Sequence, residues 1–125
     1  MESPESNSLL TALREFSKER AWEPFHTSKN LAMALSVEAS EIVELFQWLT
    51  PQESESLTER QRQALEEEIG DVMIYLTMLA GRHNLDPLRA AWRKMALNRL
   101  KYPAEQVRGK ALKAEYYTTV DPNDT

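Results

Sequence analysis

The sequence of 125 residues predicts an all-α protein, a bundle of four helices. Apolar residues recur at helical spacing in four segments joined by short polar connections, and no segment shows the sustained two-residue alternation of a half-buried strand. Two of these segments, Glu38–Leu49 and Glu68–Leu79, match position for position, and each begins with two acidic residues three positions apart. The length suits one domain, which we expect to run from residue 8 to residue 103.

The N-terminal part of the chain predicts a short flexible segment and two helices. Residues 1–7 are polar and are expected to be flexible. Leucine and phenylalanine at helical spacing predict a first helix over about residues 8–20. An aromatic connection, WEPFH, follows it. Thr27 or Ser28 can cap the second helix, which should end at about Leu49 because proline follows two residues later.

The third helix has the clearest start signal in the chain. Residues 50–57 are polar and predict a loop. Thr58 and Gln61 then have the spacing of a capping box, in which each side chain bonds to the backbone N–H of the other residue. We therefore expect a helix from this point to about Ala80.

A fourth helix is predicted after a break at residues 81–84. Asp86 followed by Pro87 is typical of a helix start, since aspartate is a good N-cap and proline fits the first helical position. The helix should end before Pro103, and its Trp92 is expected in the core. Residues 104–125 form a polar C-terminal tail.

Composition excludes several kinds of function. The formal net charge of −5 argues against a protein that binds nucleic-acid polymers, whose phosphates need a basic surface. Without cysteine, the chain has neither disulfides nor thiolate metal ligands. Its apolar runs are too short to span a bilayer, and its N-terminus lacks the features of a signal peptide. We therefore expect a cytoplasmic protein without membrane contact.

The two acidic pairs predict a metal site. Glu38 and Glu41 share one helix face, and so do Glu68 and Asp71, because residues three apart lie about one turn apart. Four carboxylates beside apolar stripes repel one another unless a cation or proton offsets their charge. A single pair would more simply be a solvated acidic edge, but two matched pairs favour a metal. All-oxygen ligands suit Mg²⁺, with Mn²⁺ as a substitute.

Substrate contacts are predicted from the helices that flank these pairs. Mg²⁺ is often bound jointly by carboxylates and substrate phosphates. Lys94, Asn98 and Tyr102 lie four residues apart and offer donors for phosphate oxygens, although an ordinary solvated helix edge has the same pattern. Trp22 and Trp48 can stack on a nucleobase, although tryptophan is more often a core residue.

Four stretches of the chain occur in a characteristic order: WEPFH, EASEIVELFQW, EIGDVMIYL and KMALNRLKYP. With these stretches the chain resembles the MazG-like all-α nucleotide pyrophosphohydrolases, and in particular their dCTP pyrophosphatase branch. The resemblance covers about residues 22–103. It implies a MazG-like bundle completed by homodimerisation, with homotetramers also formed. It further implies Mg²⁺-dependent hydrolysis of a (deoxy)nucleoside triphosphate, with dCTP or a modified dCTP as the expected substrate, to the monophosphate and pyrophosphate. The implied role is sanitation of the nucleotide pool.

The resemblance also assigns roles to residues. The implied metal ligands are Glu38, Glu41, Glu68 and Asp71. The implied substrate contacts are Trp22 and Trp48 for the base and Lys94, Asn98 and Tyr102 for the phosphates. Among the catalytic residues Glu38, Glu41 and Glu44, our hypothesis is that Glu41 or Glu44 accepts the proton of the attacking water.

Two other functions fit the same sequence. One is a helical dimerisation or regulatory module without activity, whose acidic edges only keep it soluble. The other is the same fold acting on another phosphoanhydride, such as that of phosphoribosyl-ATP. Within the dCTP pyrophosphatase branch, vertebrate proteins have a histidine near the base where our alignment places Leu13, so the sequence predicts the reaction type better than the preference for cytosine.

Overall fold

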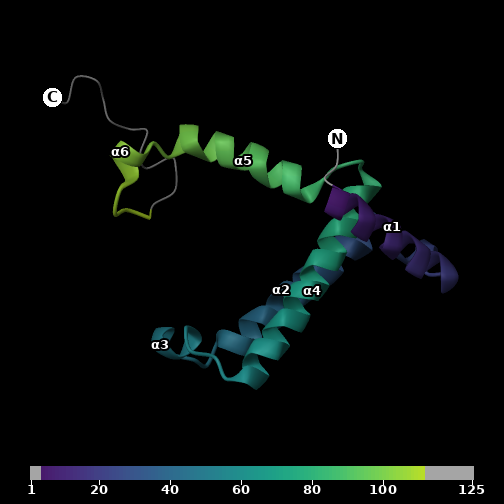
Figure 1. The fold of residues 1–125 in the computed structure, drawn as a ribbon, viewed down its shortest axis with the longest axis horizontal. Helices are drawn as coiled ribbons and strands as arrows, with labels where there is room; N and C mark the ends of the chain where they lie inside the picture. The colour runs from purple at the N-terminus through teal and green to yellow at the C-terminus, as the bar shows by residue number, and fades with distance from the viewer. Residues whose placement is uncertain (1–3, 112–125) are drawn as a thin grey trace. The chain divides into compact units, whose positions relative to one another are not determined.

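The structure, a computed structural model, describes residues 4–111 (Figure 1). Every regular element among them is a helix, which confirms the all-α prediction. In chain order the elements are α1 (Pro4–Glu19), the 3₁₀ helix η1 (Glu23–Phe25), α2 (Ser28–Phe46), α3 (Pro51–Ser54), α4 (Glu59–Arg82), α5 (Pro87–Lys101) and α6 (Ala104–Val107). Within the described range, no helix has the length and apolar content that a membrane span requires.

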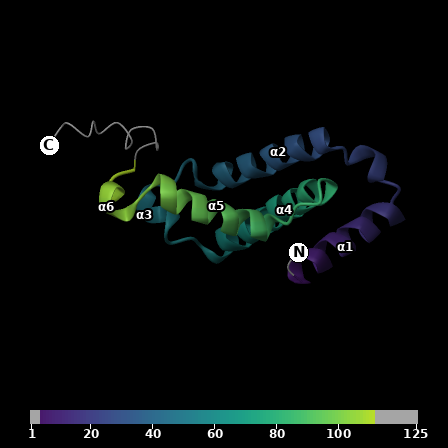
Figure 2. The same ribbon diagram turned by 90° about the horizontal axis from the view of Figure 1, so that it is seen from above.

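The chain divides into two compact units, the first ending at Pro87 and the second beginning at Leu88. In the first unit α2 and α4 lie side by side (Figure 2), and α1 packs against α4. Because only α3 and short connections separate α2 from α4, the two helices run antiparallel. Three of the four predicted helices thus pack in one unit. The four-helix bundle and the single domain over residues 8–103 stay predictions.

Side-chain caps set where α2 and α4 begin. The Thr27 hydroxyl accepts a hydrogen bond from the Asn30 backbone N–H at 3.2 Å, so Thr27 is the cap of α2. At the start of α4, the Thr58 N–H donates to Gln61 Oε1 at 2.8 Å, and the Gln61 N–H donates to the Thr58 hydroxyl at 3.2 Å. This reciprocal pair confirms the predicted capping box. Both helices therefore start where the sequence predicts.

Other boundaries differ from the prediction. Helix α1 begins at Pro4, four residues before the predicted start, since proline suits the first turn of a helix. The loop predicted over residues 50–57 contains the short helix α3. A second capping box, between Thr50 and Glu53, stabilises this helix. Helix α4 continues through Gly81 to Arg82.

The second unit consists of α5 and the short α6 in its described part. Helix α5 begins at Pro87 and ends before Pro103, as predicted. The prediction that Trp92 is a core residue is wrong, because 64% of its surface is exposed. No other element of this unit is long enough to cover its apolar face within residues 88–111. Residues 112–125 of the predicted tail lie outside the described residues.

Helix α1 approaches α4 closely at a glycine. Leu10 of α1 is 5% exposed and lies directly over Gly81 of α4, where an added Cβ would be 2.6 Å from Leu10 Cδ1. Arg14, one turn further along α1, donates a hydrogen bond from Nη2 to the Gly81 carbonyl oxygen at 3.3 Å. Glycine thus permits the contact that holds α1 on α4.

We expect Gly81→Ala to lower the free energy of unfolding by about 1 kcal/mol, because an overpacking cost of roughly 1–3 kcal/mol outweighs the gain in helix propensity. Gly70→Ala is the matched control. It lies in the same helix, and its added Cβ would meet nothing within 4 Å apart from adjacent residues and the nearby backbone of its own helix, so it should stabilise the protein by up to about 1 kcal/mol. Urea denaturation measures both variants. Equal effects of the two substitutions would contradict the tight contact.

Candidate metal centre and adjoining cavities

The antiparallel packing of α2 and α4 brings the acidic residues of the two helices together. Glu38 and Glu41 come from α2, and Glu68 comes from α4. One carboxylate oxygen from each of these three residues lies within 4.8 Å of the other two. Asp71, one turn beyond Glu68, is not part of this tight group, but its charge acts on Glu38 and on Glu68. Three of the four predicted metal ligands therefore converge.

Two oxygens of this carboxylate cluster, defined as Glu38, Glu41 and Glu68, lack partners. The side chains of Glu38 and Glu68 are half-buried, yet one oxygen of each, Oε2, is shielded from solvent without a hydrogen bond. A shielded and unpaired polar atom is costly and needs an explanation. A hard divalent cation such as Mg²⁺ or Mn²⁺ fits these oxygens, since both ions prefer carboxylate ligands.

The close carboxyls change their own protonation. The neighbouring Glu41 carboxyl raises the pKa of Glu38 from 4.5 to about 7, together with loss of hydration and the nearby Glu68. Glu41 is also the main cause of the raised pKa of Glu68, although contact with Glu38 acts in the opposite direction. Adjacent carboxyls favour a shared proton over two negative charges. A bound cation would take the place of that proton.

This predicts that the metal-free protein loses stability as the pH rises. The folded protein binds a proton at Glu38 more tightly than the unfolded chain does, so this contribution is complete below pH 4.5 and is lost as the pH passes about 7. Mg²⁺ should therefore raise the melting temperature more at pH 8 than at pH 5, where protons compete with it. Thermal denaturation with and without Mg²⁺ measures this, with Glu38→Gln as the control that flattens the profile. Equal Mg²⁺ shifts at both pH values would contradict it.

Glu44 lies one turn beyond Glu41 on α2. It is exposed and does not belong to the carboxylate cluster. This position separates it from the oxygens suited to a metal and leaves its carboxylate open to water.

A cavity of about 310 Å³ adjoins the metal centre. We call it the aromatic cavity; its lining includes Phe16, Trp22, His26, Asp71 and Tyr75. The Trp22 ring makes edge contacts with Phe16 at 5.8 Å and with His26 at 6.4 Å between ring centroids. Asp71 connects this cavity to the carboxylates, because its charge acts on Glu38 and Glu68. A base on the aromatic walls would thus lie beside phosphates at the acidic residues.

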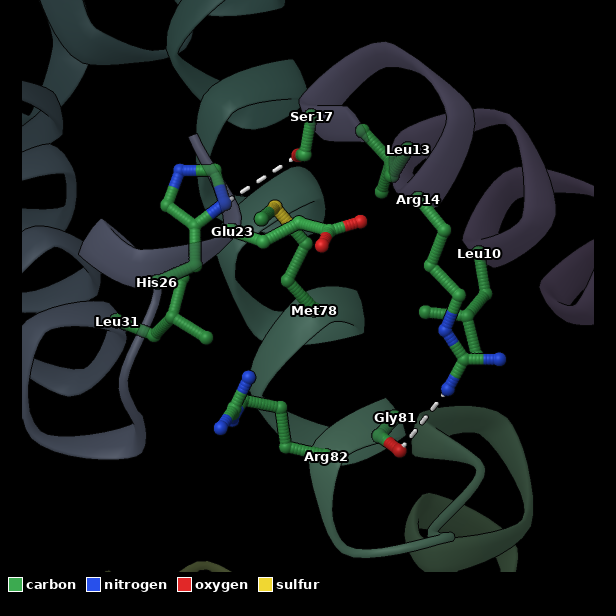
Figure 3. Close-up of a pocket in the computed structure, with 10 residues that line it drawn as sticks. All are labelled: Leu10, Leu13, Arg14, Ser17, Glu23, His26, Leu31, Met78, Gly81 and Arg82. Carbon is green, nitrogen blue, oxygen red and sulfur yellow. Dashed lines mark hydrogen bonds between the residues drawn. The ribbon is translucent and has the colours of Figure 1, made fainter. Parts of the chain in front are cut away.

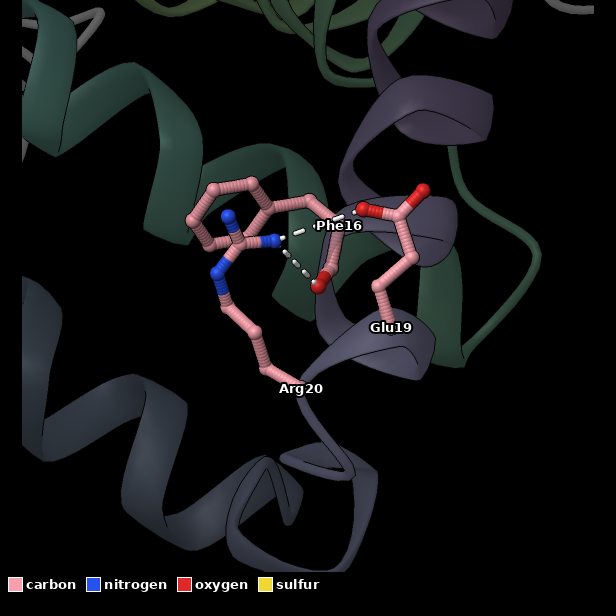
Figure 4. Close-up of polar contacts among 3 residues, drawn as sticks. All are labelled: Phe16, Glu19 and Arg20. Atoms are coloured by element: carbon pink, nitrogen blue, oxygen red, sulfur yellow. Dashed lines mark hydrogen bonds and ion pairs between the residues drawn. The ribbon is translucent and has the colours of Figure 1, made fainter.

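Arg20 supports one wall of the aromatic cavity from outside (Figure 4). Its guanidinium carbon lies 3.5 Å from the centroid of the Phe16 ring. Its Nη1 donates to the Phe16 carbonyl oxygen at 3.1 Å and pairs with Glu19 at 3.5 Å. The stacked guanidinium helps to hold the Phe16 ring in place against Trp22.

A second cavity of about 90 Å³ shares part of the aromatic cavity's wall (Figure 3). We call it the polar cavity, because Arg14, Glu23 and Arg82 line it beside apolar side chains. The residues common to both cavities are Leu13, Ser17, His26 and Met78. The buried Ser17 hydroxyl lies 3.3 Å from His26 Nδ1, and this hydrogen bond fixes the shared wall.

The remaining predicted substrate residues lie elsewhere. Trp48 follows α2 with 87% of its surface exposed, and it lines neither cavity. Lys94 and Asn98 belong to α5 in the second unit, and Tyr102 follows that helix, its N–H donating to the Asn98 carbonyl oxygen at 2.8 Å. Nearby Lys101 lowers the pKa of Lys94. The phosphate contacts of these three residues and the base contact of Trp48 stay predictions.

Sequence reasoning missed several residues of the cavities. Tyr75 lies four residues after Asp71 on α4, so helical spacing alone could have placed both on one face. Phe16 and Ser17 come from α1, whose packing against α4 left no signal in the sequence. Glu23 belongs to the WEPFH stretch that was singled out for its tryptophan.

Known proteins resemble this chain over most of its length. Rat and human dCTP pyrophosphatase 1 are each 46% identical to it over 101 residues, which cover 79% of this chain and 59% of each relative. The alignments thus span about three fifths of the length of these curated relatives. A pyrophosphatase from Archaeoglobus fulgidus has a crystal structure that superimposes with a TM-score of 0.75 at 41% identity, over 82% of this chain and 96% of that one.

The family model agrees with these relatives. The model of the MazG-like family matches residues 33–116, a segment that begins in α2 and includes all four predicted metal ligands. Together with the all-helical fold, this match shows that the chain belongs to the MazG-like family.

Proposed function

We propose that this chain hydrolyses (deoxy)nucleoside triphosphates, dCTP or a modified dCTP best, to the nucleoside monophosphate and pyrophosphate. Water attacks, the bond between the α phosphate and the bridging oxygen of pyrophosphate breaks, and one proton is released. The names of the dCTP pyrophosphatase relatives support the substrate. The observation that carries the proposal is the carboxylate cluster with its two shielded, unpaired oxygens beside the aromatic cavity. Its role would be to clear such nucleotides from the cytoplasmic pool.

Mg²⁺ would be held by the four acidic residues Glu38, Glu41, Glu68 and Asp71. Bound there, the ion would neutralise phosphate charge and lower the pKa of a bound water. Trp22 and Tyr75 would hold the base in the aromatic cavity. Glu44 is the better candidate to accept the proton of the attacking water, because Glu41 belongs to the cluster suited to the metal and Glu44 does not.

We further propose that a second copy of the chain covers the apolar surface of the first unit. Exposed apolar side chains at helical spacing lie along α2 and α4, namely Met33, Val37, Ile69, Met73 and Leu76. Among the described residues, Leu10 and Leu31 are the only buried apolar side chains, so much apolar surface is left uncovered. Burying it against another copy stabilises both chains. Light scattering after size-exclusion chromatography distinguishes monomer, dimer and tetramer.

A panel of nucleoside triphosphates, incubated with the protein and Mg²⁺, tests the activity. The products must be separated so that monophosphate plus pyrophosphate is distinguished from diphosphate plus phosphate. We expect pyrophosphate release that is fastest with dCTP and that stops with EDTA. Phosphoribosyl-ATP is included to test the other phosphoanhydride. Absence of turnover with Mg²⁺ and with Mn²⁺, together with no thermal shift on adding nucleotide and metal, would instead favour the dimerisation module.

A further inference from the structure

Two oppositely charged and exposed side chains, Glu23 and Arg82, line the polar cavity and make no ion pair with the described residues. Arg14 uses its guanidinium to hold the Gly81 carbonyl oxygen. In Figure 3 the Glu23 carboxylate extends toward α1, and the Arg82 guanidinium lies on the opposite side of the cavity, near Leu31. Within residues 4–111, neither side chain makes a hydrogen bond or an ion pair. A donor and an acceptor are thus both available to a ligand.

Helix α4 orders the parts of the site along one face. Asp71 lies beside the carboxylate cluster, Tyr75 and Met78 line the aromatic cavity, and Met78 and Arg82 line the polar cavity. These residues are three or four positions apart, so their side chains follow one stripe of the helix. At roughly 1.5 Å per residue, Arg82 lies about 16 Å beyond Asp71 along the helix axis. A nucleotide with its phosphates at the acidic end would direct its base toward the polar cavity.

We propose that Glu23 and Arg82 read the hydrogen-bonding edge of the base, an inference that rests on the proposed function. The Glu23 carboxylate accepts from an exocyclic amino group, and the Arg82 guanidinium donates to the neighbouring ring nitrogen. The ligand class is a base that has an amino group next to a ring acceptor. Cytosine has this edge.

Uracil and thymine present the opposite pattern. They have a carbonyl oxygen in place of the amino group, and their ring nitrogen carries a proton. The carbonyl oxygen would face the Glu23 carboxylate, so that two acceptors meet. The protonated ring nitrogen would face the Arg82 guanidinium, so that two donors meet. A site with fixed polar groups rejects such an analogue strongly, because its own groups are left unpaired. The pair would therefore select cytosine nucleotides over uracil and thymine nucleotides.

Glu23→Gln tests the proposal, because glutamine keeps the shape of glutamate and can donate as well as accept. We expect the ratio of kcat/KM for dCTP to that for dUTP to fall about tenfold or more, with a gain or little change for dUTP. Arg82→Met removes the donor and should lower the same ratio. Glu15→Gln, the same chemical change at an exposed position of α1 that lines neither cavity, should leave it unchanged.

Calorimetric binding of dCMP and dUMP without metal separates this inference from the proposed reaction. The wild-type protein should bind dCMP more tightly, and Glu23→Gln should remove the difference. Suppose that dCTP is hydrolysed but that Glu23→Gln keeps both the kcat/KM preference for dCTP over dUTP and the binding preference for dCMP over dUMP. The proposal that Glu23 reads the base is then wrong, and the proposed reaction stands. If the wild type binds dCMP selectively but hydrolyses nothing, the reaction is wrong and the base reading stands. Equal binding of dCMP and dUMP by the wild type overturns the base reading.

Discussion

Glu38→Gln is expected to abolish nucleotide hydrolysis, lowering kcat by about 10³-fold or more. The substitution removes one ligand of the proposed metal and keeps the size of the side chain. It also removes one of three crowded carboxylates, so the metal-free variant should be at least as stable as the wild type. We expect its melting temperature to lose the increase that Mg²⁺ gives the wild type. A steady-state assay and thermal denaturation measure the two effects.

Glu44→Gln is the matched comparison on the same helix. If Glu44 accepts the proton of the attacking water, this variant loses about 10²–10⁴ in kcat and keeps the thermal shift with Mg²⁺. Comparing the two variants thus separates loss of the metal from loss of the group that accepts the proton. A Glu38→Gln enzyme with near-normal turnover and a normal Mg²⁺ shift would remove Glu38 from the metal site.

Trp22→Ala is expected to raise KM for dCTP by about 5- to 100-fold with a small effect on kcat, because stacking of one base on an aromatic side chain contributes roughly 1–3 kcal/mol. The loss falls on binding, since Trp22 lines the aromatic cavity and is not part of the carboxylate cluster. Initial rates over a range of dCTP concentrations measure it. An unchanged KM for every nucleotide tested would assign Trp22 to structure alone.

Trp48→Ala provides the informative contrast. Trp48 is far more exposed than Trp22, at 87% against 44%, and lines neither cavity of its own chain. A rise in KM as large as that of Trp22→Ala would mean that Trp48 reaches a base in another way, as it would across the interface with a second copy. An unchanged KM would contradict the base contact predicted for it.

Local patterns predicted the parts of this structure that depend on neighbours along the chain. The capping box at Thr58 and the acidic pair at Glu38 and Glu41 each depend on residues three positions apart, and the structure has the cap as predicted and brings that pair together with Glu68. Helix α3 was missed because a box of the same type, at Thr50, lies in a segment read as polar loop.

Contacts between distant segments were not predictable in the same way. Spacing places Tyr75 on the face of Asp71, but it does not show that Phe16 of α1 lies opposite. The contact depends on Gly81, where the absence of a side chain lets Leu10 approach, and a lone glycine within a helical pattern has several explanations. The exposure of Trp92 shows a second limit of prediction from sequence. Helical spacing predicts an apolar face, but it does not show which element covers that face.

Helix α1 supplies walls to both cavities through Leu13 and Ser17, yet it contributes no oxygen to the carboxylate cluster, which belongs to α2 and α4. Under the proposed function, α1 and η1 would therefore contribute to recognition of the base without carrying a metal ligand, whereas α4 would contribute to both tasks. Substitutions in α1 and η1 would then change which nucleotide is accepted while leaving the proposed metal ligands unchanged. A scaffold divided in this way can acquire new substrates through few mutations, and it offers protein engineers a region to randomise at low risk to the chemistry.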